Sequence, residues 1–189
     1  MRRYLSAMLK RILLIAAAAA CAVAAPALAA GPAVVAATTA GAPHIELTQM
    51  MGRWYEVARL PNQLQRGCEA GTSDWTPSGG GFAVVQACHK GRVDGPVSEW
   101  KARARSLDPV TNSIFKMSFF GGLVSKEYRV LDHHPAEGWL ILSTDDHHYL
   151  WLMSQKPVMT AAVRSQALAR IKQLGFDVGR LEFPAPPRS

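Results

Sequence analysis

Cys68, Cys88 and His89 are the residues whose types could support covalent chemistry. A cysteine thiolate beside a histidine base is an activated nucleophile. Strand alternation, however, would place Cys68 and His89 on opposite faces, and a disulfide between Cys68 and Cys88 would consume the thiol. We therefore expect a protein that is not an enzyme and that has no catalytic residues.

Two pairs of adjacent histidines are candidates for binding a metal ion or haem. His133–His134 follows Asp132, and His147–His148 follows Asp145–Asp146. Adjacent residues on a strand point in opposite directions, and neither pair has the spacing of a zinc site. We expect neither a metal site nor another cofactor.

The elements that position these residues follow an N-terminal targeting segment. A basic stretch, residues 1–11, precedes a short apolar stretch, residues 12–20, and small residues then lead up to Ala29. This order is typical of a secretory signal peptide. We predict a signal peptide over residues 1–29 and export of the mature chain.

Cys21 offers an alternative way to process the N-terminus. Residues 18–21 (AAAC) weakly resemble the bacterial site at which a signal, here residues 1–20, is removed and lipid is attached to the cysteine. In either case residues 30–43 form a flexible, low-complexity tether. Cys68 and Cys88 then remain as an even pair in an oxidising compartment, where a disulfide is the simplest outcome; the alternative is two unpaired, buried thiols.

The charge of the mature chain is mild. Four of the 21 basic residues lie in the first 30 residues, which hold no acid, so 17 basic residues face 14 acidic residues thereafter. That balance does not favour nucleic-acid binding. Hydrophobic residues make up 49% of the chain, which is enough for one packed domain.

The mature chain shows eight short stretches with the period-two pattern of strands, followed by one helical pattern. The strands are expected at residues 54–60, 71–75, 82–89, 99–105, 115–119, 126–131, 139–143 and 148–154. Such spacing predicts an up-and-down barrel or a sandwich. Thr160 can cap a helix whose apolar face carries Val163, Ala167, Ile171 and Leu174. Residues 184–189 form an extended, proline-rich tail.

The turn at residues 76–81 provides a check on the cysteine pair. If the hairpin is centred at Ser78, residues whose numbers sum to 156 lie opposite each other. Cys68 and Cys88 meet this condition, which brings them within reach of a crosslink on the outer face.

Four motifs resemble those of the lipocalin family. They are residues 52–59 (GRWYEVAR, with a G-x-W start), 118–121 (SFFG), 149–152 (YLWL) and 175–178 (GFDV). The resemblance covers residues 44–183. The motifs resemble those of the bacterial outer-membrane lipocalins and of their relatives, the plant temperature-induced lipocalins and apolipoprotein D.

The resemblance implies an all-β fold: an eight-stranded antiparallel up-and-down barrel, open at one end, with one C-terminal α-helix packed outside. It also implies non-covalent binding of a fatty acid or lysophospholipid, with a role in lipid storage, transport or maintenance of the cell envelope. The expected location is the periplasm or the outer membrane, lipid-anchored if Cys21 is modified. One departure concerns Gln155, which stands where many lipocalins have an arginine that stacks on the signature tryptophan.

Alternation along the strands, combined with the resemblance, identifies residues expected to face the cavity. They are Trp54, Glu56, Ala58, Ser73, Trp75, Val85, Ala87, Trp100, Ala102, Phe115, Met117, Phe119, Tyr128, Val130, Leu140, Leu142, Tyr149 and Trp151. The cavity rim is expected to carry Arg66, Lys90, Arg92 and Lys126, which could attract an anionic headgroup.

An alternative is a barrel filled by its own side chains, which would act as an envelope interaction or scaffold module. Less favoured alternatives are a lipocalin-type isomerase and a metal or haem binder. The expected partner is a lipid-like small molecule rather than nucleic acid, with peripheral or lipid-anchored membrane association and a monomeric or homodimeric state.

Overall fold

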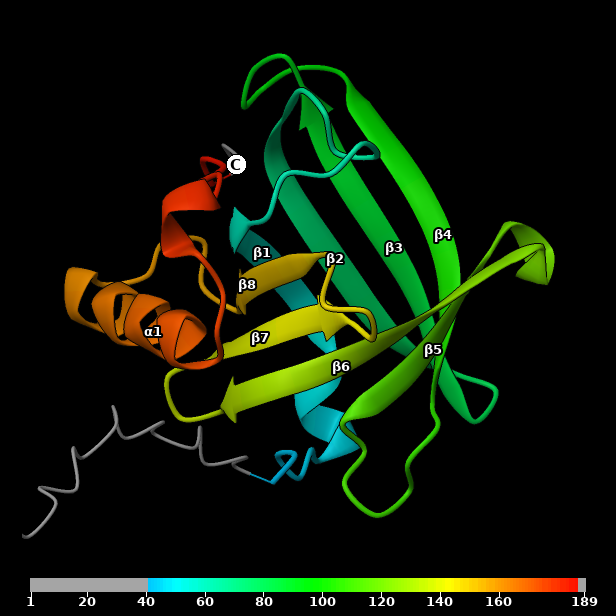
Figure 1. Cartoon of the computed structure of the whole chain (residues 1–189). Coiled ribbons are helices and arrows are strands. Elements are labelled where there is room, and N and C mark those ends of the chain that lie inside the picture. Colours follow the sequence, from blue (N-terminus) through cyan, green and yellow to red (C-terminus); the bar gives the residue numbers. More distant parts are fainter. Residues whose placement is uncertain (1–40, 187–189) are drawn as a thin grey trace, which may run out of the picture. The chain divides into compact units, whose positions relative to one another are not determined.

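The computed structural model describes residues 41–186 (Figure 1). The predicted signal peptide, most of the tether, Cys21 and residues 187–189 lie outside the described residues.

Eight antiparallel strands form a closed barrel in which each strand pairs with the next and β8 pairs with β1. The strands are β1 Gly52–Arg59, β2 Cys68–Ser78, β3 Gly81–Lys90, β4 Val97–Ser106, β5 Ile114–Phe119, β6 Val124–His134, β7 Trp139–Thr144 and β8 Leu150–Ser154. One helix, α1 Ala161–Gln173, follows them. The prediction of an eight-stranded barrel with a single late helix is confirmed.

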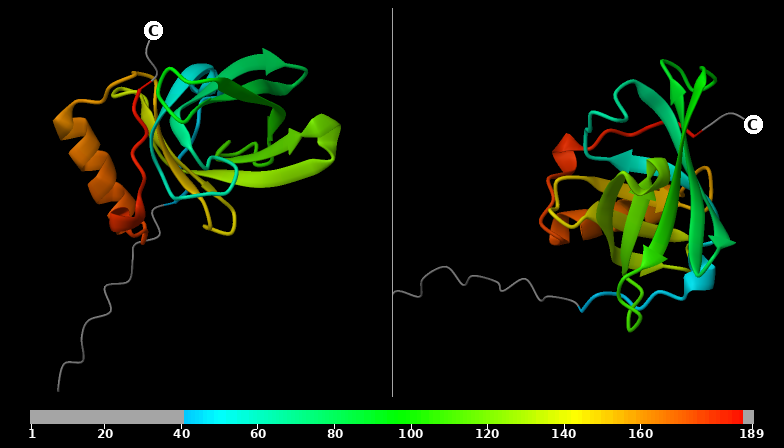
Figure 2. Two further views of the ribbon diagram at one scale, coloured as in Figure 1. Left: turned by 90° about the horizontal axis from the view of Figure 1, so that it is seen from above. Right: turned by 90° about the vertical axis from the view of Figure 1, so that its right-hand side faces the viewer.

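Helix α1 packs outside the barrel against β7 and β8 (Figures 1 and 2). The side chain of Thr160 caps the helix by accepting a hydrogen bond from the Val163 amide. Ala167 and Ile171 are fully buried in a cluster with residues such as Trp139 and Leu152. Strand β7 is consequently buried on both faces, one toward the helix and one toward the barrel interior.

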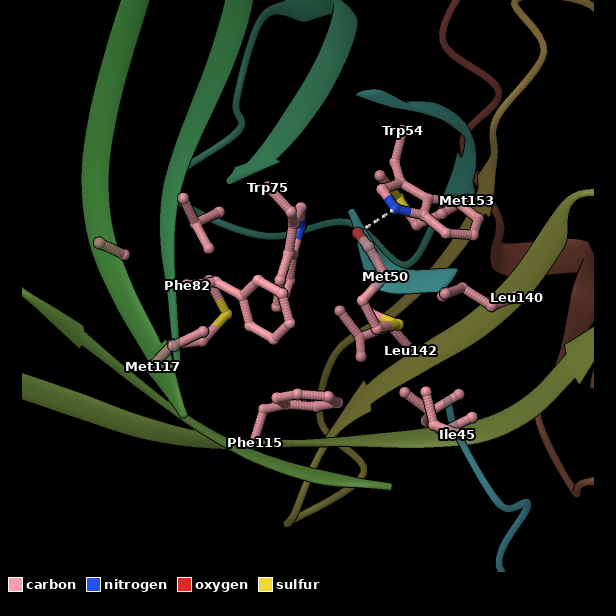
Figure 3. Packing of buried hydrophobic residues seen from close by; sticks show 14 residues of the cluster. Ile45, Met50, Trp54, Trp75, Phe82, Phe115, Met117, Leu140, Leu142 and Met153 are labelled. Atoms are coloured by element: carbon pink, nitrogen blue, oxygen red, sulfur yellow. Dashed lines mark hydrogen bonds between the residues drawn. The ribbon is translucent and has the colours of Figure 1, made fainter. Parts of the chain in front are cut away.

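The base of the barrel is packed with side chains. A short 3₁₀ helix, η1 Leu47–Met50, precedes β1, and the Trp54 indole nitrogen donates a 2.9 Å hydrogen bond to the Met50 carbonyl (Figure 3). Trp75, Phe82 and Phe115 pack edge to face with one another in the same buried cluster.

Gln155 helps to close this end of the barrel. Its side-chain amide donates a 3.3 Å hydrogen bond to the Gln49 carbonyl, so it binds the backbone of the segment that covers the base. A glutamine cannot make the cation–π contact of the family's arginine, and here it contributes a neutral hydrogen bond instead.

The disulfide between Cys68 and Cys88 is confirmed, with 5.5 Å between the two Cα atoms. The predicted register is wrong, because the turn is Gly79–Gly80 and Ser78 pairs with Gly81. Both turn glycines have positive φ, which a tight two-residue hairpin requires. Cys88 therefore lies opposite Gly71, and a bulge next to Cys68 brings the two sulfurs together.

The predicted outer-face position of the disulfide is also wrong. A Cβ built on Gly71 would meet the Glu56 side chain, which lines the barrel interior, at 2.8 Å. Because Cys88 is directly opposite Gly71 in the sheet, its side chain shares that interior side. Both cysteines are buried, near the end where β2 begins and β3 ends.

The C-terminal segment completes the wall where β1 and β2 separate. Only Gly52–Tyr55 of β1 pairs with β2, and its partners there are Thr72–Trp75. Beyond this, Glu182 exchanges two backbone hydrogen bonds with Arg59, and the Ala185 amide donates to the Glu69 carbonyl. Figure 2 shows this segment (red) passing between α1 and the barrel.

A buried ion pair lies at the same place. The Arg59 guanidinium donates to Glu56 at 2.5 Å, to the exposed Glu182 at 2.9 Å and to the Cys68 carbonyl at 2.8 Å. The Arg59 and Glu56 side chains are 5% and 4% exposed. One arginine therefore links β1, the start of β2 and the C-terminal segment.

We expect removal of the disulfide to destabilise the barrel. The double substitution Cys68→Ala and Cys88→Ala should lower the free energy of unfolding by about 3 kcal/mol, because the unfolded chain gains freedom. Urea denaturation of the variant and of the reduced wild-type protein should give similar midpoints, both below that of the oxidised protein. Equal midpoints for oxidised wild type and variant would contradict this.

We expect the substitution Arg59→Met to cost about 3–5 kcal/mol of unfolding free energy at pH 7, because it leaves the buried Glu56 carboxylate unpaired. Without the guanidinium, the pKa of Glu56 in the folded state rises further above its unfolded value. The loss should therefore shrink at acidic pH, where the carboxyl is protonated.

The matched control is Arg53→Met. Arg53 forms a 2.7 Å ion pair with Asp74 at the surface, with side chains 55% and 31% exposed. That substitution should cost less than about 1 kcal/mol in urea denaturation. Equal losses for the two arginine variants would show that the buried pair has no special role.

Candidate binding cavity

The barrel interior is hollow between its packed base and the loops at the other end. The cavity has a volume of about 430 Å³ and is open to solvent. The loops between β1 and β2, β3 and β4, β5 and β6, and β7 and β8 all lie at this end, because consecutive strands of the barrel alternate in direction. We call this end the mouth.

Twelve of the residues expected to face the cavity border it. They are Trp54, Glu56, Ser73, Trp75, Ala87, Trp100, Phe119, Tyr128, Leu140, Leu142, Tyr149 and Trp151. The placement follows from strands that alternate between the interior and the outside, except for Ala87, which lies between the inward Gln86 and Cys88. The aromatic side chains give the walls a largely apolar surface.

Four further residues lie inside the barrel without bordering the cavity. Ala102, Phe115, Met117 and Val130 belong to a buried cluster that also contains cavity residues such as Trp54 and Leu142. They are packed inside the barrel, and they do not border the cavity. Alternation determines the side of the sheet and says nothing about depth along the barrel axis.

Ala58 and Val85 do not border the cavity, and each departure has a local cause. A bulge between Glu56 and Ala58 shifts the pairing of β1 with β8, so Ala58 packs with the helix cluster. Val85 lies opposite Asp74, whose carboxylate binds Arg53 at the surface.

Ten further residues that strand alternation did not predict line the cavity. They are Met50, Asn62, Leu64, Gln65, Thr72, Gln86, Phe120, Val124, Thr144 and Met153. Several belong to loops or to η1, where no periodic pattern indicates which side chains turn inward. The inward position of Gln86 would have followed from the correct hairpin register.

Gln65 is the centre of a polar patch on one wall. Its side-chain oxygen accepts hydrogen bonds from Trp151 Nε1 at 2.7 Å and from Asn62 at 2.6 Å. Its amide nitrogen donates to Glu56 at 2.5 Å. These bonds fix the β1–β2 loop against β8 and satisfy the buried carboxylate of Glu56.

Burial affects two titratable groups that line the cavity. Desolvation raises the pKa of Glu56 against the opposing effect of the Arg59 guanidinium. Desolvation also raises the pKa of Tyr128 to about 12, so its phenol is neutral at ordinary pH. Tyr128 therefore presents an uncharged ring and hydroxyl to the cavity.

The four predicted rim residues lie at the mouth, and Lys126 also borders the cavity. Lys126 binds Asp146 at 2.7 Å and holds the pKa of that carboxyl well below its usual range. Arg92 binds Asp94 at 3.1 Å. Lys90 donates to the Arg66 carbonyl and lies 5.6 Å from the centre of the Trp100 ring.

The cysteine and histidine side chains that were considered for catalysis or metal binding take part in structural contacts instead. The disulfide consumes the Cys68 thiol, so Cys68 and His89 cannot act as a nucleophile and base. His134 stacks on Trp139 with 3.9 Å between ring centres, and His147 stacks on Phe176. Within residues 41–186, no three His, Cys, Asp or Glu side chains are grouped as metal ligands.

The cavity is an apolar enclosure with polar groups on one wall and at the rim. This arrangement suits reversible binding of a mostly apolar molecule. In the described part of the chain, no helix is both long and apolar enough to cross a bilayer.

Known proteins share this architecture. A family model described as a lipocalin-like domain matches residues 45–186. The outer membrane lipoprotein Blc of Vibrio cholerae serotype O1 is 29% identical over 140 residues, which cover 73% of this chain and 81% of that protein. Temperature-induced lipocalin-1 of Arabidopsis thaliana is 24% identical over 157 residues, 77% of this chain and 83% of that protein.

Insecticyanin from the tobacco hornworm Manduca sexta has the same fold, with a TM-score of 0.62 and 14% identity over 76% of this chain and 82% of that chain. The region matched by the family model contains all eight strands and the external helix. The chain therefore belongs to the lipocalin-like domain family, whose fold serves the binding of small hydrophobic ligands.

Proposed function

We propose that this protein binds a single-chain lipid, a fatty acid or a lysophospholipid, non-covalently in the barrel cavity. The observation that carries the proposal is the 430 Å³ cavity, which is walled mainly by aromatic and aliphatic side chains and open at one end. Its size lies within the range of roughly 300–1,000 Å³ that is usual for small-molecule sites.

The acyl chain would lie between the aromatic walls, with the polar headgroup toward the mouth. Lys126 borders the cavity there, and Arg66, Lys90 and Arg92 surround the opening. Such basic groups favour a carboxylate or phosphate over a neutral headgroup.

The proposed setting is the cell envelope. Two of the relatives matched are outer membrane lipoproteins of Vibrio cholerae and Escherichia coli. We infer export to the periplasm or the outer membrane, with Cys21 as the anchor if it is lipidated, and a role in lipid storage, transport or maintenance. Binding and release without chemical change is sufficient for that role, so no catalytic step is invoked.

We expect a long-chain fatty acid and a lysophospholipid to quench the tryptophan fluorescence of the delipidated protein. Trp54, Trp75, Trp100 and Trp151 border the cavity, whereas Trp139 faces the helix. The titration should saturate at one lipid per chain, and a short polar acid should cause no change. Failure of a folded, delipidated protein to bind either lipid would favour the interaction-module alternative.

We expect Leu142→Trp to weaken lipid binding at least about tenfold, because the added ring occupies cavity volume and removes apolar wall. Isothermal titration calorimetry avoids interference from the new tryptophan. The matched control is Lys101→Trp, which places the same ring on the exposed outer face of β4 and should leave affinity unchanged. Equal affinities of the two variants would place the ligand outside the cavity.

A further inference from the structure

Four large apolar side chains are exposed at the mouth. Leu64 of the β1–β2 loop is 76% exposed, and Phe120, Leu123 and Val124 of the β5–β6 connection are 65%, 88% and 52% exposed. Single exposed apolar residues are ordinary, but a group at one end of a molecule indicates an interaction surface.

The β5–β6 connection holds its apolar tip in a costly backbone conformation. Phe120, Gly121 and Gly122 have φ values of 51°, 69° and 99°. Two glycines adopt this region freely, whereas a phenylalanine does so at an energetic cost. The result is a protruding tip, Phe120–Val124, that presents its side chains to solvent instead of burying them.

The exposed side chains are continuous with the cavity. Leu64, Phe120 and Val124 each line the cavity as well as being exposed. A hydrophobic molecule entering or leaving through the mouth would therefore pass along apolar surface up to the outermost atoms of the protein.

The charges at the mouth favour an anionic surface. The β5–β6 loop carries no charge, and Arg66 is the charged residue of the β1–β2 loop. Arg92 and Lys90 accompany Asp94 at the β3–β4 loop, while Asp145 and Asp146 are paired with Arg129 and Lys126. The β1–β2 and β3–β4 loops, together with Lys90 at the end of β3, thus carry three basic residues and one acidic residue.

We propose that the mouth of the barrel docks on the surface of a phospholipid bilayer. The tip and Leu64 enter the interfacial region, and the basic residues contact lipid phosphates. The exposed apolar side chains lie on two separate loops at the opening. A bilayer surface is fluid, so it can contact both loops at the same time. Docked in this way, the cavity opens directly onto the membrane and exchanges its lipid without carrying it through water.

The test is flotation with phospholipid vesicles. It uses the chain with Cys21→Ser, which cannot carry a lipid anchor, and vesicles of phosphatidylcholine alone or mixed with phosphatidylglycerol. The protein should float with both vesicle types, more strongly with the anionic mixture, and salt should reduce this difference. No ligand is added, so the outcome does not depend on the proposed lipid binding.

A matched pair of variants locates the surface. Leu123→Asp, at the tip, should lower the partition coefficient about tenfold, because an apolar anchor becomes a charged group near the lipid. Val110→Asp makes the same type of change on an equally exposed residue, 76% exposed in the β4–β5 loop at the opposite end. It should leave vesicle binding unchanged.

Absence of flotation for the Cys21→Ser chain would overturn the proposal, as would equal flotation of the two aspartate variants. Sedimentation equilibrium tests whether a second copy of the chain occupies this surface instead. If the protein does not bind vesicles but forms a dimer that Leu123→Asp abolishes, the surface is a dimer interface. Neither Leu123 nor Val110 lines the cavity, so the solution affinity for fatty acid should be the same in both variants.

Discussion

Closure of the barrel is the constraint on which the rest of the structure depends. Each strand is hydrogen-bonded on both sides, so side chains can point only into the barrel or away from it. Where α1 covers the outside, at β7 and β8, both faces must be apolar. On β4, which α1 does not cover, the outer face carries the exposed side chains of Lys101, Arg103 and Arg105.

Closure also divides the interior into two parts with different uses. Near the base, Trp75, Phe82 and Phe115 meet edge to face and leave no room, while η1 covers the end. Toward the mouth the same barrel stays hollow, because the loops do not fold over it. The packed base supplies stability, and the hollow part is free to take an apolar ligand without disturbing the core.

The place where β1 and β2 separate carries the buried charges. Strands β1 and β2 separate toward the mouth, and the C-terminal segment joins them through backbone hydrogen bonds. Arg59 donates hydrogen bonds to the Glu56 carboxylate and to the Cys68 carbonyl there. Buried polar groups need such partners, so this cluster fixes the shape of one cavity wall, with Gln65 extending it into the β1–β2 loop.

The sequence by itself determined the number of strands, the helix, the cysteine pair and most inward-facing residues, because strand alternation and turn residues are local properties. Tertiary structure alone decided the register of the β2–β3 hairpin and the bulge that turns Ala58 outward. A one-residue change in pairing reverses the face of every side chain that follows, and local propensity does not specify it. Gln65, Leu64 and Phe120 reached the cavity from loops, whose course depends on what the closed barrel leaves open.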